Sequence, residues 1–138
     1  MGNSTWSGPV RSENGFESIT KNATTGAVTT NASYGKSITG GVQSLSGPGA
    51  INLTDLITEI SATGTSDALT LADGTAGQIK ILTYVAESAG GDSSVITPTT
   101  FANGSTITMD AVGDGCVLVY SETSGWAVVG SIAIAISS

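Results

Sequence analysis

The sequence contains no histidine, one cysteine and only four lysines and arginines among its 138 residues. Histidine is the commonest general base and a common metal ligand, so its absence removes the Ser-His-Asp and Cys-His catalytic arrangements. The single Cys116 forms no internal disulfide and no CxxC site. With eleven acidic and only four basic residues, the chain is not expected to bind nucleic acid, because that binding requires clustered Lys and Arg. We therefore expect a structural role, with no enzyme activity and no nucleic-acid partner.

Long apolar runs are also missing. The longest extends from Trp126 to Ile136, well short of the ~18 residues that indicate a membrane-spanning helix. The N-terminus is polar and lacks the apolar segment of a secretory signal. We expect no membrane association.

Hydroxyl groups and glycine supply most of the polarity. The chain has 20 threonines, 19 serines and 19 glycines, whereas charged residues make up only 11%. Apolar residues make up 39% and the mean hydropathy is +0.23. The sequence therefore has enough apolar material for a core.

Residues 1–46 differ from the rest, because their large apolar side chains are few and widely spaced. Such isolated side chains cannot form a core of their own. One alternative is a disordered tail. Three of the seven aromatic residues lie here, however, so we predict an extended arm that inserts side chains into a partner. The predicted anchors are Trp6, Pro9, Val10, Phe16 and Tyr34.

Residues 47–138 are predicted to form an all-β body. Turn signals such as Asp73-Gly74, Asn103-Gly104 and Ser124-Gly125 separate short segments rich in Ile, Val and Thr, a spacing typical of a sandwich or barrel. A helix is the alternative over 53–61, where leucine and isoleucine also fit helical spacing. The β-branched residues of that segment favour a strand. We predict a small β-barrel or jelly-roll-like sandwich preceded by the extended N-terminal arm.

Two of the expected strands are unusually apolar. The segment CVLVYS, from Cys116, is apolar on both faces, as expected of a strand inside a closed sheet or between subunits. In SIAIAIS, near the C-terminus, Ile132, Ile134 and Ile136 are expected on one face with alanines on the other. Left exposed, this isoleucine row would favour aggregation. We predict that these isoleucines form a subunit contact, with a central strand of the body as the alternative.

Few residues suggest a chemical site. Asp110 and Asp114 flank a glycine turn and are candidates for holding a cation such as Ca²⁺, but ordinary turn hydrogen bonding is the favoured interpretation. Asp55 and Glu59 are a weak candidate acid–base pair. Cys116 lies in an apolar run and is expected to be a small buried side chain. We assign no catalytic, cofactor-binding or metal-binding residue.

Several motifs within residues 71–131 are informative together. They are DGT-x-GQIK at Asp73–Lys80, the block GGDSSVITP ending at Pro98, F-x-NG-x-T-I-T-x-D-x-VGD at Phe101–Asp114, and GW-x-V-x-G at Gly125–Gly130. This region resembles a module of virion structural proteins of tailed phages, particularly marine ones. The opening WSGPVRSENGF, at Trp6–Phe16, resembles the arm-like start of such proteins.

The resemblance implies a function. Proteins of this kind are capsid cement or decoration proteins, or parts of head and tail fibres, and are commonly trimeric. We therefore expect a capsid decoration protein, made in the host cytoplasm and bound as a homotrimer to the major capsid protein on the outer capsid surface of the virion. The alternative is a tail or head fibre module that recognises a host surface glycan through loops at 86–94 or 121–126.

Overall fold

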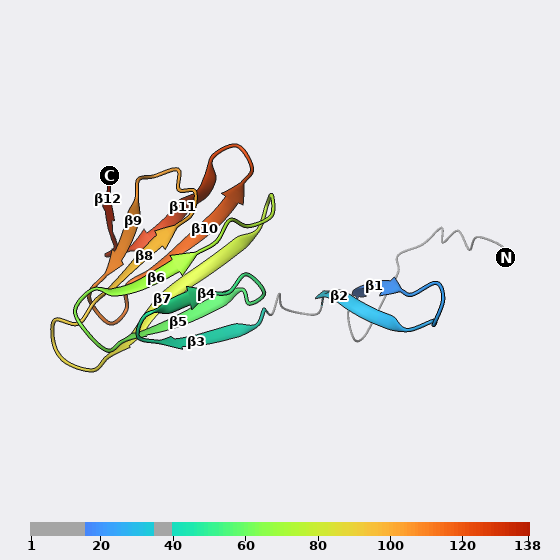
Figure 1. The fold of residues 1–138 in the computed structure, drawn as a ribbon, viewed down its shortest axis with the longest axis horizontal. Coiled ribbons are helices and arrows are strands. Elements are labelled where there is room, and N and C mark those ends of the chain that lie inside the picture. The colour runs from blue at the N-terminus through green and yellow to red at the C-terminus, as the bar shows by residue number, and fades with distance from the viewer. Residues whose placement is uncertain (1–15, 35–39) are drawn as a thin grey trace. The chain divides into compact units, whose positions relative to one another are not determined.

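The computed structural model describes residues 16–34 and 40–138, which belong to two compact units divided between Thr39 and Gly40 (Figure 1). In the first unit, β1 (Phe16–Lys21) and β2 (Val28–Tyr34) form an antiparallel hairpin. Its turn is stabilised by Asn22, whose Oδ1 accepts the backbone N–H groups of Thr24 and Thr25, each at 2.9 Å. The N-terminal segment therefore contains local β structure.

The second unit, residues 40–138, is the body, and its ten strands form two five-stranded sheets. We name each sheet after its central strand. The β7 sheet has the order β11-β10-β7-β5-β3, and the β8 sheet has the order β12-β9-β8-β6-β4. The strands are β3 (Val42–Ser46), β4 (Gly49–Ile51), β5 (Ile57–Ala62), β6 (Asp67–Leu71), β7 (Ile79–Glu87), β8 (Ser94–Pro98), β9 (Thr106–Met109), β10 (Gly115–Ser121), β11 (Gly125–Ile132) and β12 (Ala135–Ser137).

From β3 to β8 the chain alternates between the two sheets. Within each sheet the first three strands in chain order are therefore parallel, β3-β5-β7 in one and β4-β6-β8 in the other. The later strands, β9 to β12, pair antiparallel. The prediction of an all-β sandwich is confirmed. The barrel alternative is wrong because neither sheet closes, and the parallel pairs distinguish the fold from an antiparallel jelly roll.

The core lies between the two sheets and follows the alternation of each strand. Along β5 and β10, every second side chain is buried. Trp126 is fully buried, its ring meets Tyr120 edge-on at 5.2 Å, and its Nε1 donates to the carbonyl oxygen of Ala72 at 2.8 Å. Each large apolar side chain of this kind stabilises the fold by about 1.5–3 kcal/mol. Trp126 is thus a core anchor.

The body begins at Gly40, earlier than the boundary expected at residue 47. The reason is β3, whose residues are predicted to belong to the arm but pair in parallel with β5. The helix alternative over 53–61 is wrong, since β5 occupies Ile57–Ala62 and buries Ile60 and Ala62 in the core. The boundary at Gly40 and the strand at Ile57–Ala62 both depend on parallel pairing between segments that are distant in sequence.

The predicted C-terminal strand SIAIAIS is two strands in different sheets. β11 ends at Ile132, Ala133 has a left-handed φ of 52°, and β12 starts at Ala135. The three isoleucines therefore do not share a face, and neither strand is central, because β11 and β12 are both edge strands. A left-handed alanine breaks the alternation without leaving a signal in the sequence.

Candidate functional site

The outer face of the β7 sheet is lined by β-branched apolar side chains. Cross-strand pairing aligns Val42 with Ile57, Ile57 with Ile81, and Ile81 with Val117, which makes one apolar row across β3, β5, β7 and β10. Val42 is 51% exposed. The other three are half-buried. Along their strands they alternate with residues that are buried in the core, so the row faces outward from the sandwich.

Further apolar residues extend this row in both directions. On one side Ile79 pairs with Val119, and Val119 pairs with Ala127. Near the other side Ile132 is 69% exposed. We call the whole set the apolar face. It consists of Val42, Ile57, Ile79, Ile81, Val117, Val119, Ala127 and Ile132.

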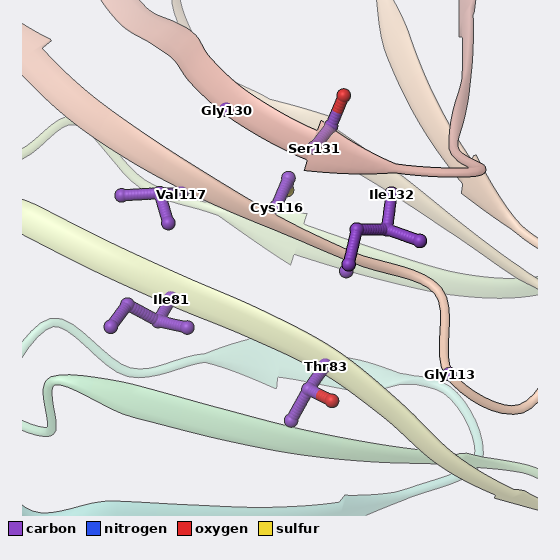
Figure 2. A pocket seen from close by; sticks show the side chains of 9 residues that line it. Ile81, Thr83, Gly113, Cys116, Val117, Gly130, Ser131 and Ile132 are labelled. Atoms are coloured by element: carbon purple, nitrogen blue, oxygen red, sulfur yellow. The ribbon is translucent and has the colours of Figure 1, made fainter.

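A hollow of about 280 Å³ interrupts the apolar face between β7, β10 and β11 (Figure 2). Two glycines account for it, because Gly115 lies between Thr83 and Ile132 in one row, and Gly130 lies opposite Val117 in the next. Figure 2 shows Thr83 on β7, Val117 on β10 and Ile132 at the end of β11 around the opening. The hollow is open to solvent, and its lining is mainly apolar.

The outer face of the β8 sheet is different in character. Its outward positions are held mainly by alanine, threonine and serine, whose small or hydroxyl-bearing side chains are compatible with water. On β6 and β8, Ala68, Thr70 and Thr97 are exposed, while Val95 is half-buried. The apolar character is therefore concentrated on one face of the sandwich.

The body is strongly acidic. Residues 40–138 hold nine of the eleven Asp and Glu residues and one of the four Lys and Arg residues, a formal net charge of −8. The one basic residue, Lys80, is fully buried. Its Nζ donates to the backbone carbonyl of Asp55 at 2.6 Å, and burial lowers its pKa, an effect that the charge of Asp55 partly opposes. The charges on the surface of the body are therefore negative.

Buried aspartates at one end of the sandwich stabilise its loops. Asp114, a candidate cation ligand, accepts the backbone N–H groups of Asp110 and Ala111 at 3.0 and 3.1 Å through one carboxylate oxygen. Asp67 accepts the N–H of Thr63 in the same way, and Asp92 accepts that of Ala89. Turn hydrogen bonding is thus the observed role of Asp114. Within the described residues, no three side chains of the metal-binding types gather into a site.

The other residues considered for chemistry also stabilise local structure. The Asp55 carboxylate accepts the Nδ2 of Asn52 at 2.7 Å within the β4–β5 loop. Glu59 lies half-buried on the outer side of β5, next to the apolar face. Cys116 is buried as expected, and burial raises the pKa of its thiol to about 12. Cys116 lines the hollow, whereas Asp55 and Glu59 do not.

The predicted interface residues are found in different places. Trp6, Pro9 and Val10 lie outside the described residues, and Phe16 and Tyr34 are backbone partners at the open end of the β1–β2 hairpin. Of the isoleucines, Ile132 belongs to the apolar face, Ile134 packs against the core, and Ile136 is 40% exposed on the edge strand β12. Among the predicted interface residues that the structure describes within the body, Ile132 alone belongs to the apolar face.

Most of the apolar face was not identified from the sequence. The apolar character of CVLVYS was noted, and it indicated Val117 and Val119. The pairing of Val42, Ile57 and Ile81 depends on the parallel register of three strands, β3, β5 and β7, which no local pattern predicts. The two glycines that create the hollow gave no signal either.

No protein-family model matches the chain, and a search of the curated proteins finds no similar sequence. In the part of the chain that the structure describes, no helix has the length and apolarity to cross a bilayer. The features of the described residues that bear on function are therefore the apolar face and the negative charge around it.

Proposed function

We propose that this protein is a capsid decoration protein of a tailed phage, and that its body attaches to the outer surface of the shell through the apolar face. The observation that carries the proposal is the apolar row from Val42 to Val117, which lies on the outer face of the β7 sheet. Exposed contiguous apolar surface marks protein interaction sites. The resemblance of residues 71–131 to phage virion modules supplies the identity of the partner.

Burial is the physical basis of the proposed function. Attachment removes Val42, Ile79 and Ile132 from water, each of them about half or more exposed in the free body. A decoration protein that bridges two capsid subunits adds this free energy to the cost of separating them. The proposed homotrimer multiplies the effect, because several weak contacts on one particle dissociate slowly.

The charge of the body supports a basic partner surface. Its net charge of −8 favours a shell surface that carries Lys and Arg around an apolar centre. Such complementarity increases the association rate more than the affinity.

The glycan-binding alternative has less support. Sugar recognition commonly uses exposed aromatic rings, as stacking surfaces. The loop at 86–94 contains no aromatic residue, and Trp126, which ends the 121–126 loop, is fully buried. We therefore propose only the decoration function.

Co-sedimentation tests the proposal. The purified full chain is mixed with phage shells that lack it, and the bound fraction is measured against the same chain without shells. We expect saturable binding that weakens as salt increases. Failure to bind the shells at any salt concentration would overturn the proposed function.

A further inference from the structure

The hollow in the apolar face has the form of an anchoring site. We infer that the hollow at Gly115 and Gly130 receives one large apolar side chain, aromatic or aliphatic, from the protein surface on which the β7 sheet docks. The inference rests on the proposed function, because it takes docking through the apolar face as given. It specifies the chemical nature of one side chain on the partner surface.

The size of the hollow favours a side chain over a small-molecule ligand. Small-molecule sites usually measure about 300–1,000 Å³ and enclose most of the ligand. This hollow measures about 280 Å³ and is open on one side. Hot spots of protein interfaces, in contrast, are single large side chains seated in pockets near the centre of a larger contact.

The backbone makes the hollow permanent. A Cβ atom on Gly115 would lie 2.9 Å from the carbonyl oxygen of Leu82, so the chain leaves no space for a side chain there. Gly130 has no neighbouring atom within 4 Å of the position of a Cβ. Its outward space is empty because the residue is glycine, and a larger residue would fill the hollow without strain.

The charges around the hollow indicate what accompanies the anchor. Glu59 pairs with Thr83, which lines the hollow, and the exposed Asp110 belongs to the loop that leads to Gly115. A second copy of this chain would bring its own acidic groups to the same place. A partner that presents Lys or Arg beside its apolar side chain fits better.

Filling the hollow tests the inference. Gly130→Leu occupies the space in which the partner side chain would sit, and Gly130→Ala occupies less of it. Gly90→Leu is the matched control, because Gly90 lies in the β7–β8 loop, also with no atom within 4 Å of a Cβ. We expect Gly130→Leu to weaken shell binding about thirty-fold, as for loss of a hot spot, and Gly130→Ala to weaken it less. Gly90→Leu should bind as the unmodified chain does.

A second measurement examines the hollow without shells. Free indole is titrated into the isotope-labelled full chain, and the backbone amide resonances are followed by NMR. We expect shifts confined to the surroundings of Gly115, Gly130 and Ile132, retained in Gly90→Leu and absent in Gly130→Leu. The same spectra report whether each variant is folded.

The outcomes separate the inference from the proposed function. Absence of shell binding by the unmodified chain would overturn the proposed function, whereas the indole titration would still test the hollow. Shell binding that Gly130→Leu leaves unchanged would overturn the inference alone, as would indole shifts that are absent or spread over the body. Self-association abolished by Gly130→Leu would identify a second copy as the occupant and would also overturn it.

Discussion

The two outer faces of the sandwich belong to sheets of equal strand number but differ in chemistry. The β8 sheet presents Ala68, Thr70 and Thr97 to water, whereas the β7 sheet presents the apolar row and Ile132. The fold requires each sheet to be apolar only on its inner side. Folding therefore does not require the outer face of the β7 sheet to be apolar. This difference between the two outer faces indicates a partner that covers the β7 sheet.

The largest expected effect tests whether side chains of the apolar face stabilise the fold as much as side chains of the core do. Leu118 points into the core and is fully buried, whereas Ile132, in the apolar face, is 69% exposed. Leu118→Ala should lower the free energy of unfolding by about 2–5 kcal/mol, and Ile132→Thr by less than about 0.5 kcal/mol. Urea unfolding measures both. Similar losses in the two variants would contradict the distinction.

The next largest expected effect is the change in shell binding when a charge is introduced on one or the other outer face. Ile79→Lys places a positive charge on the apolar face, and Thr97→Lys places the same charge on the outer face of the β8 sheet. We expect roughly thirty-fold weaker shell binding for Ile79→Lys, comparable to loss of a ~2 kcal/mol hot spot, and no weakening for Thr97→Lys. Co-sedimentation compares the two. Equal weakening would mean that the β8 sheet also takes part in docking.

The loss of stability at alkaline pH distinguishes the inner side of β10, which carries a buried thiol, from its outer side. Burial raises the pKa of Cys116 from 9.0 to about 12, so the folded state holds a proton that the unfolded state releases. This contribution to stability is fully present below pH 9 and is lost as pH rises to 12, by up to about 1.4 kcal/mol per pH unit. The raised pKa of Tyr84 acts in the same direction and the lowered pKa of Lys80 in the opposite one.

The matching variants isolate the thiol. Cys116→Ala should be less stable at neutral pH but should lose less stability between pH 9 and 12. Val117→Ala, changed on the outer side of the same strand, should retain the full alkaline loss. Thermal unfolding across this pH range gives the comparison. An identical pH profile for Cys116→Ala and the unmodified chain would be inconsistent with a buried thiol.

The smallest expected effect concerns the rim of the apolar face. Glu59 is half-buried beside the row, and a Lys or Arg of the partner is expected next to it. Glu59→Gln should weaken shell binding by about two- to five-fold at low salt and by less at high salt, the range of an exposed ion pair. Glu122→Gln, in the exposed β10–β11 turn, is the control. A salt-independent loss for Glu59→Gln would indicate a packing role instead of a charge interaction.

Local patterns were sufficient for the strands but not for their arrangement. Turn residues and β-branched segments predicted the all-β body, and the apolar run around Cys116 predicted that its side chain is buried, because these depend on neighbours in sequence. The parallel winding from β3 to β8 depends on pairing between distant segments, so the boundary at Gly40 was not foreseen. Ala133 separates Ile132 from Ile136 by a backbone conformation that its residue type does not indicate.

The same limit applies to the site. Ile132 was predicted as a contact residue from its apolar segment, whereas the row from Val42 to Val117 exists only through register. The sequence therefore indicated that the chain is unusually apolar in places. It did not indicate that the apolar residues of four strands meet on one face.

Cysteine protection tests the central claim most directly. The native Cys116 is buried, so a cysteine introduced at Val42, in the apolar face, or at Thr97, on the β8 sheet, is the reactive one. Each variant is treated with a maleimide, free and bound to shells. Docking through the apolar face predicts that binding protects Val42→Cys and leaves Thr97→Cys reactive. Protection of Thr97→Cys with Val42→Cys still reactive would contradict the account.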